Sequence, residues 1–165
     1  MKQNLLFIFF NLVCISVFSQ NSIDSLENIM ISENWNAIRD NEKLLIINEL
    51  IDANWHVSPQ KNTDYGRQAL ELARDLQNFE KQVDALKNIG KAYFYLNKYQ
   101  QAFRFYWMSL DLAQEINYQK GISESCYNLG LIFFTQCNYK KALEYFNRSL
   151  ESNRQKECLY FMQFV

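Results

Sequence analysis

The chain has 165 residues, of which 48% are hydrophobic, and this is enough for one modest folded domain. Its 17 lysines and arginines nearly balance its 18 acidic residues, so no strong net field favours nucleic acid or another polyanion as a partner. Phenylalanine (13) and tyrosine (10) are abundant, whereas glycine (4) and proline (1) are scarce. Few helix-breaking residues and many aromatic ones predict an all-α protein.

Residues 1–19 have the pattern of a secretory signal peptide. A lysine near the start precedes a nearly unbroken apolar run over residues 5–18, and Val17 and Ser19 suit the −3 and −1 sites of a signal peptidase. The run is shorter than the roughly 20 residues that a membrane-spanning helix needs. A retained anchor or a buried helix is the alternative. We expect a bacterial protein that is exported to the periplasm or secreted, with a mature chain that begins near Gln20.

The cysteines give no sign of a disulfide or a metal site. Cys126, Cys137 and Cys158 remain after the signal peptide, an odd number for an oxidising compartment. On one straight helix Cys126 and Cys137 would lie about 16 Å apart by helix rise, too far for a disulfide. No CxxC motif or Cys/His cluster suggests zinc. We therefore interpret these cysteines as small buried apolar residues.

Residues 20–40 are expected to form a leading helix. The segment Ser22 to Met30 combines a polar N-cap residue with apolar residues at helical spacing. We expect this helix to cover the open side of the first repeat.

Beyond residue 40 the sequence repeats with a period of 40. A copy shifted by 40 residues matches at small, aromatic and amide positions: Asn88 with Asn128, Gly90 with Gly130, Tyr93 with Phe133, Ala102 with Ala142, Tyr106 with Phe146, and Ser109 with Ser149. A fainter first copy includes Asn48, Ala69 and Leu70. Self-similarity at such a period is typical of stacked helical units. Apolar residues at helical spacing split each copy into two helices.

The spacing within each copy resembles that of the tetratricopeptide repeat family. Five family positions are filled in the second copy by Gly90, Tyr93, Ala102, Tyr106 and Ser109, and the third copy matches all five. The resemblance covers roughly residues 41–155 and implies three helix pairs, at about 41–80, 81–120 and 121–157, stacked into a short right-handed α-solenoid. The period is longer than the commoner one of about 34. Such long repeats are similar to those in the exported sensor regions of bacterial histidine kinases and LuxR-like regulators.

The resemblance also implies a concave groove lined by the first helix of each pair. It places there Asp84, Lys87, Asn88, Lys91, Phe94 and Tyr95 of the second copy, and Glu124, Tyr127, Asn128, Leu131, Phe134 and Thr135 of the third. An asparagine amide offers donors and an acceptor that match an extended peptide backbone. We expect Asn88 and Asn128 to grip such a backbone, with Lys87 and Lys91 beside them. Apolar pockets are expected at Phe94, Tyr95, Tyr127 and Phe134. The alternative is that both asparagines tie neighbouring helices together.

Nothing in the sequence indicates catalysis. The only histidine, His56, lies in an expected turn, and the four glycines are scattered singly rather than gathered in a phosphate loop. We expect no enzyme activity, no cofactor and no metal. The predicted function is binding of a protein or peptide segment by an exported module, as the sensor part of a signalling protein. The alternative is a self-association scaffold that joins copies through the apolar tail 158–165, or a fragment of a larger regulator.

Overall fold

The computed structural model describes residues 23–55 and 58–162, with the backbone alone for residues 33 and 155–162. The expected signal peptide and His56 lie outside the described residues. Within the described part every regular element is helical, which confirms the all-α prediction. After a helix over residues 23–31, the elements are a 3-10 helix η1 (Glu33–Ala37) and the α-helices α2 (Asp40–Asn54), α3 (Pro59–Asp75), α4 (Phe79–Tyr95), α5 (Tyr99–Glu115), α6 (Gln119–Thr135) and α7 (Tyr139–Met162).

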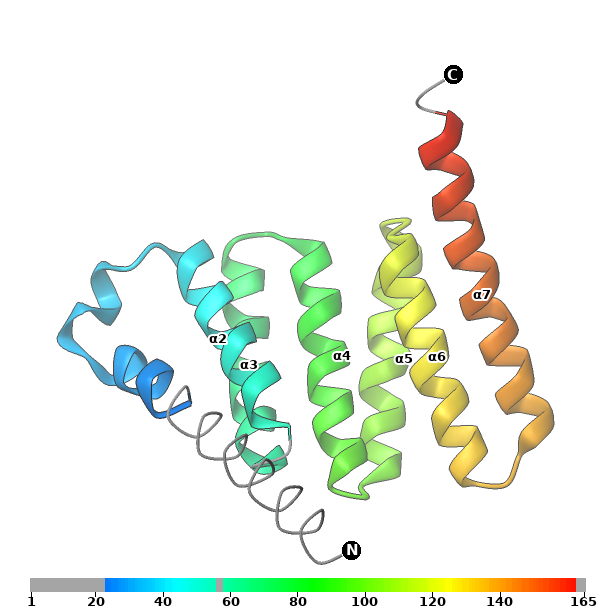
Figure 1. Ribbon diagram of the computed structural model, residues 1–165, viewed down its shortest axis with the longest axis horizontal. Helices are drawn as coiled ribbons and strands as arrows, with labels where there is room; N and C mark the ends of the chain where they lie inside the picture. The colour runs from blue at the N-terminus through cyan, green and yellow to red at the C-terminus, as the bar shows by residue number, and fades with distance from the viewer. Residues whose placement is uncertain (1–22, 56–57, 163–165) are drawn as a thin grey trace, which may run out of the picture.

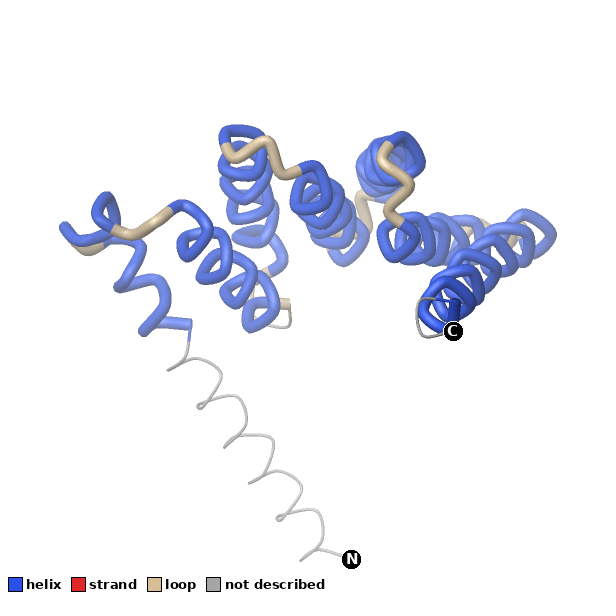
Figure 2. The backbone as a smooth tube through the Cα atoms, turned by 90° about the horizontal axis from the view of Figure 1, so that it is seen from above, coloured by secondary structure: helices blue, strands red, loops and turns tan. Residues whose placement is uncertain are grey.

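The helices form a solenoid in which each helix packs against the next (Figure 1). Three pairs follow one another, α2 with α3, α4 with α5, and α6 with α7, as the view from above also shows (Figure 2). The first helices α4 and α6 of neighbouring pairs also contact each other. The first helices therefore line a common side of the stack.

Helix length explains the 40-residue period. Helices α4, α5 and α6 have 17 residues each, and three-residue turns over 96–98, 116–118 and 136–138 join them to the next helix. Each of these turns, and the turn over 76–78 between α3 and α4, contains one residue with a left-handed backbone. These residues recur at intervals of 20: Gln77, Asn97, Asn117 and Cys137, with φ between 50° and 58°. The next residue then donates its N–H five residues back, as from Lys98 to Tyr93 O at 2.9 Å. This hydrogen bond closes the helix end without a glycine.

A glycine and an aromatic ring form the contact inside each of the last two pairs. A methyl group placed on Gly90 would lie 2.7 Å from the nearest ring carbon of Tyr106, and one on Gly130 would lie 2.6 Å from Phe146. Such distances are far below ordinary carbon contact. Tyr106 is 1% exposed. Glycine is thus the residue that lets the ring of the second helix rest on the first helix.

Buried serines connect the helices around the second and third pairs. The Ser109 hydroxyl of α5 donates to Val83 O of α4 at 3.0 Å and lies 2.9 Å from the Ser125 hydroxyl of α6. In the third pair the Ser123 hydroxyl of α6 donates to Ser149 O of α7 at 2.9 Å. These hydroxyls satisfy one another in a packed interior, where an unpaired polar group would be costly.

The N-terminal end of the solenoid is covered by the helix over residues 23–31 and by η1. Ile23 is buried. The Glu27 carboxylate accepts a hydrogen bond from Tyr65 Oη at 2.6 Å and pairs with Lys61 Nζ at 2.7 Å, both from α3. Hydrogen bonds from Lys61 and then Tyr65 hold the pKa of Glu27 below its usual range. The leading segment is thus a short helix followed by a 3-10 turn.

At the C-terminal end α7 has 24 residues and projects beyond its neighbours (Figure 1). The backbone of residues 158–162 continues this helix, while the side chains of the predicted tail lie outside the described residues. No helix of the described part is both long and apolar enough to span a bilayer. Cys126 is buried as expected, but the interpretation of Cys137 as buried is wrong. Cys137 is exposed because it occupies the left-handed position of a surface turn.

Candidate functional site: the groove of the first helices

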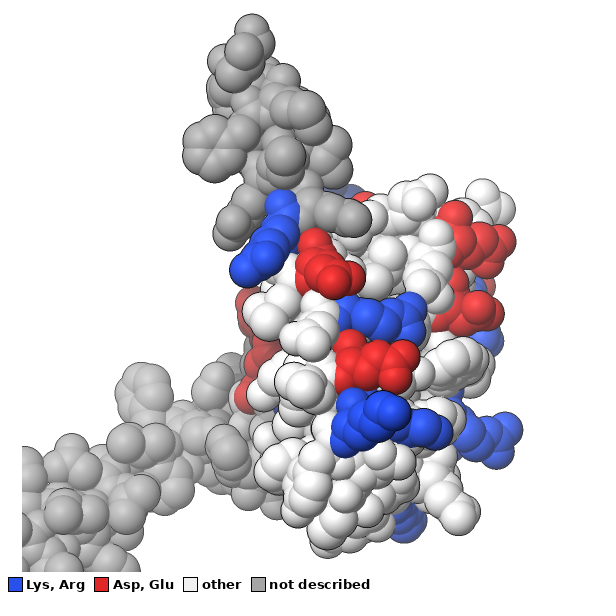
Figure 3. Space-filling view, turned by 90° about the vertical axis from the view of Figure 1, so that its right-hand side faces the viewer, with Lys and Arg blue, Asp and Glu red and all other residues white. Residues whose placement is uncertain are grey.

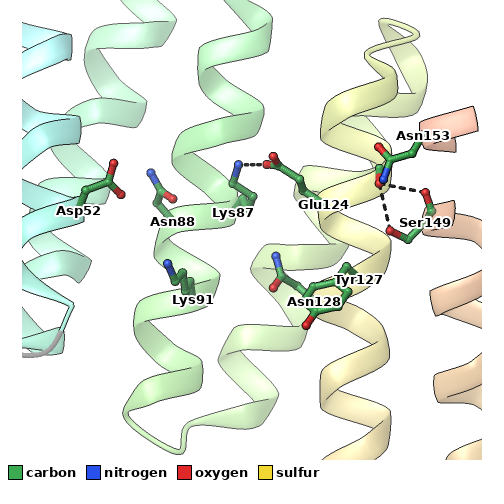
Figure 4. A pocket seen from close by; sticks show the side chains of 10 residues that line it. Asp52, Lys87, Asn88, Lys91, Glu124, Tyr127, Asn128, Ser149 and Asn153 are labelled. Carbon is green, nitrogen blue, oxygen red and sulfur yellow. Dashed lines mark hydrogen bonds and ion pairs between the residues drawn. The ribbon is translucent and has the colours of Figure 1, made fainter. Parts of the chain in front are cut away.

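A groove with a cavity of about 510 Å³ runs along the first helices (Figure 4). Helices α2, α4 and α6 contribute most of its lining, and α7 closes one end. The lining residues are Asp52, Lys87, Asn88, Lys91, Ser123, Glu124, Tyr127, Asn128, Ser149 and Asn153. All of these residues have polar or charged side chains, and both signs of charge are present.

The structure brings five of the eight predicted binding residues together in this groove: Lys87, Asn88, Lys91, Tyr127 and Asn128. Phe94, Tyr95 and Phe134 do not line the cavity. They lie at the C-terminal ends of α4 and α6. The predicted positions therefore divide into a polar groove and an aromatic rim beside it.

Asn88 and Asn128 occupy the same position of α4 and α6. Both side chains point toward the preceding first helix (Figure 4). Both are half-buried, and neither amide hydrogen-bonds to another described residue. Each amide therefore keeps its donors and its acceptor available in the groove.

Lys87 is engaged within the chain. Its ammonium forms an ion pair with Glu124, which joins α4 to α6 across the groove (Figure 4). It also lies 3.4 Å from the Asp84 carboxylate. Because two carboxylates already neutralise this ammonium, its first role is to hold the two pairs in register.

Lys91 has a different environment. Its Nζ lies 3.9 Å from the centre of the Trp55 ring, a cation–π contact between α4 and the end of α2. Burial lowers the pKa of the Lys91 ammonium, and the Asp52 charge acts in the opposite direction. Among the described residues no carboxylate lies within 4.0 Å of it. Lys91 therefore presents an incompletely compensated positive charge beside the two asparagines.

The aromatic rim repeats with the same 40-residue period. Phe94 meets Tyr99 edge-on at 5.4 Å between ring centroids, and Phe134 meets Tyr139 at 5.5 Å. Tyr95 is 48% exposed and Phe134 is 54% exposed. These rings offer apolar surface at two places one repeat apart.

Four lining residues were not predicted from the sequence: Asp52, Ser123, Ser149 and Asn153. By the period of 40, Asp52 corresponds to Ala92 and Ile132, which are both buried, so the repeat gave no signal for it. The repeat identifies Ser149 only as a small position, and its side chain both contacts Ser123 in the interior and borders the cavity. Within the described part, no group of three or more His, Cys, Asp or Glu residues could hold a metal ion.

Comparison with known proteins identifies the repeat. The tetratricopeptide repeat family model matches residues 82–155. No curated protein matches the chain. Among solved structures, the tetratricopeptide repeat domain of Arabidopsis FLU is similar over 71% of this chain and 99% of its own, with a TM-score of 0.63 and 18% identity.

Two further structures share the fold. Aspartyl phosphate phosphatase F from Bacillus subtilis is similar over 81% of this chain, with a TM-score of 0.69 and 17% identity. BtubC (BKLC) from P. vanneervenii is similar over 84%, with a TM-score of 0.64 and 18% identity. This chain spans 34% and 56% of their respective lengths. Residues 82–155, the second and third helix pairs, therefore match the tetratricopeptide repeat family, and the preceding helix pair continues the same fold.

Proposed function

We propose that the chain is an interaction module that binds an extended protein or peptide segment along the groove of α2, α4 and α6. The family match of residues 82–155 supports the coarser part of this proposal, because tetratricopeptide repeats are typically protein–protein interaction scaffolds and not catalysts. The finer part depends on the groove itself.

The observation that carries the proposal is the pair of unengaged amides at Asn88 and Asn128. If these asparagines tied neighbouring helices together, their amides would donate to or accept from another helix. Instead they leave groups that match the N–H and C=O of an extended backbone. Binding through the backbone would make affinity depend little on the ligand's side chains.

The surroundings of the asparagines indicate which ligand side chains the groove favours. The positive charge of Lys91 favours an acidic side chain near the middle of the groove. The rim rings Tyr95 and Phe134 favour apolar side chains on the adjacent side. An extended segment with alternating acidic and apolar residues fits both, since neighbouring side chains of such a segment point to opposite sides.

A peptide library displayed on phage tests this function. Peptides selected on the whole chain should lose at least about tenfold in affinity with Asn88→Ala plus Asn128→Ala, which corresponds to about 1.4 kcal/mol. Fluorescence anisotropy measures the affinity, and circular dichroism checks the fold. The matched control is Asn41→Ala, an exposed asparagine on α2 outside the groove. Equal affinities of the double variant and the control would contradict the proposal.

We propose in addition that the chain is exported and serves as the sensor part of a signalling protein. The support is the charge and apolar pattern of residues 1–19, together with the long repeat period. A fusion of residues 1–30 to alkaline phosphatase, an enzyme active only after export, should be active in a bacterial host. Replacement of Phe9 and Phe10 by aspartate should abolish this activity by interrupting the apolar run. An inactive parent fusion would refute export.

A further inference from the structure

Helix α7 exposes leucines at positions that are covered in the preceding pair. Leu150 is 59% exposed, whereas its counterpart Leu110, 40 residues earlier, is 2% exposed. Leu143 is 61% exposed, and its counterpart Phe103 packs edge-on against Phe133 of α6 at 5.9 Å. The surface of α7 is therefore of the kind that this fold buries against another helix.

The exposed surface of α7 has an apolar stripe with a charged edge. Tyr139, Leu143 and Leu150 follow one another at helical spacing, and all three are at least 59% exposed. Lys140 and Glu151 are exposed on one edge of this stripe. The view onto this end of the molecule shows Lys and Arg alternating with Asp and Glu beside uncharged surface (Figure 3). We call the set Tyr139, Lys140, Leu143, Leu150 and Glu151 the α7 face.

We propose that the α7 face pairs with the α7 face of a second copy of this chain, with the two helices antiparallel. In that arrangement a two-fold axis passes at the level of Phe146, between the centre of residues 143 and 150 and the centre of residues 140 and 151. Leu143 then lies close to Leu150 of the second copy, and Lys140 lies close to Glu151 of the second copy. The two-fold axis repeats both contacts.

Charge decides between the two possible orientations. A parallel pair would place the charged edges of the two copies on opposite sides of the contact, so Lys140 and Glu151 would meet no opposite charge of the partner. The antiparallel pair places both charged edges on the same side, where Lys140 of each copy faces Glu151 of the other. A symmetric contact of this kind also closes at the dimer and does not extend into filaments.

The expected dimer is weak. One helix from each copy buries less than the roughly 1,200 Å² of a stable standard interface. Dimerisation should therefore depend on concentration and be visible only in roughly the micromolar range or above. The leucines and charged residues that carry this inference do not line the groove, so either proposal can fail without the other.

Sedimentation velocity of the whole chain, over about 1 to 500 μM, tests the pairing. The parent chain should shift from monomer to dimer, and Leu143→Glu plus Leu150→Glu should weaken the association at least tenfold. The control is Leu45→Glu, because Leu45 is 59% exposed on α2, far from α7 in the chain. This control should dimerise like the parent. Circular dichroism verifies that each variant is folded.

A charge exchange tests the antiparallel orientation. Lys140→Glu and Glu151→Lys should each weaken the dimer several-fold, because each places like charges opposite one another. The variant with both changes should recover the parent's association, because the opposite charges meet again. A chain that stays monomeric throughout, a dimer indifferent to the leucine changes, or a double exchange that fails to recover association would each overturn the proposal. The first outcome would leave the α7 face to a helix of another protein.

Discussion

The second and third helix pairs, α4 with α5 and α6 with α7, have the same interior and different surfaces. Inside, Gly90 against Tyr106 is reproduced by Gly130 against Phe146 at nearly the same distance. In the groove, Lys91 of the second pair corresponds to Leu131 of the third, 40 residues on. The interior repeats because close packing of the helices requires the same small and aromatic residues in each pair. Residues on the groove side can change without disturbing that packing.

Because groove residues can change between the pairs, the groove positions that do not change need an explanation other than packing. Asn88 and Asn128 are identical although neither is held by a hydrogen bond to the described chain. Packing therefore gives no reason for an asparagine at either place. Contact with the proposed ligand would explain an asparagine at both places. Variants of these two residues can therefore separate a role in binding from a role in the fold.

The largest expected contrast between the pairs is at Leu110 and Leu150. Leu110→Ala should lower the free energy of unfolding by about 2 to 5 kcal/mol, because it opens a cavity in a buried contact. Leu150→Ala should change it by no more than about 0.5 kcal/mol, since the side chain is largely exposed. Urea unfolding at low protein concentration measures both, so that weak association does not contribute. Similar losses at the two sites would mean that α7 is covered as α5 is.

The glycines provide a second contrast. Gly90→Ala gains about 1 kcal/mol in helix propensity but pushes a methyl group into the Tyr106 ring, so we expect a net loss of about 1 to 2 kcal/mol. Gly130→Ala should lose less, because Phe146 is only half-buried and can move. Thermal unfolding of the two variants gives the comparison, with the difference between Gln101→Ala and Gln101→Gly at an exposed position of α5 as a propensity control. A more stable Gly90→Ala variant would contradict the tight contact.

Much of this fold could be predicted from the sequence because its determinants are local and repeated. Matching Gly90, Tyr106 and Ser109 with residues 40 positions later is enough to identify paired helices, and the structure shows why those residues recur. The resemblance to tetratricopeptide repeats also implies five residues that line the groove, because in that family one face of the first helix lines it, and residues at helical spacing share that face.

What the sequence could not reveal depends on contacts between distant residues or on backbone geometry. The ion pair of Lys87 with Glu124 and the position of Lys91 over Trp55 require the relative placement of three helices. The left-handed turn residues were missed because glycine, their usual signal, is absent, and Cys137 occupies one of them. Whether the outer surface of α7 is covered depends on what packs against it, which the repeat pattern does not specify.

The turns therefore supply a third prediction. Cys137→Gly should raise the free energy of unfolding by about 0.5 to 1 kcal/mol, because its φ of 58° is unfavourable for a residue with a side chain. Asn97→Gly should gain less, since asparagine tolerates this conformation better. Urea unfolding under reducing conditions separates the two. A loss of stability in Cys137→Gly would indicate that the cysteine side chain makes a contact worth more than the strain.

The smallest expected effect concerns the two asparagines and decides between their possible roles. Alanine has a higher helix propensity than asparagine by about 0.5 kcal/mol, and neither amide bonds to the described chain. Asn88→Ala and Asn128→Ala should therefore each stabilise the fold slightly, measured by urea unfolding. If the amides tied helices together, each change would instead cost about 1 kcal/mol. A gain in stability together with a loss of peptide binding would show that both asparagines are present for a ligand and not for the solenoid.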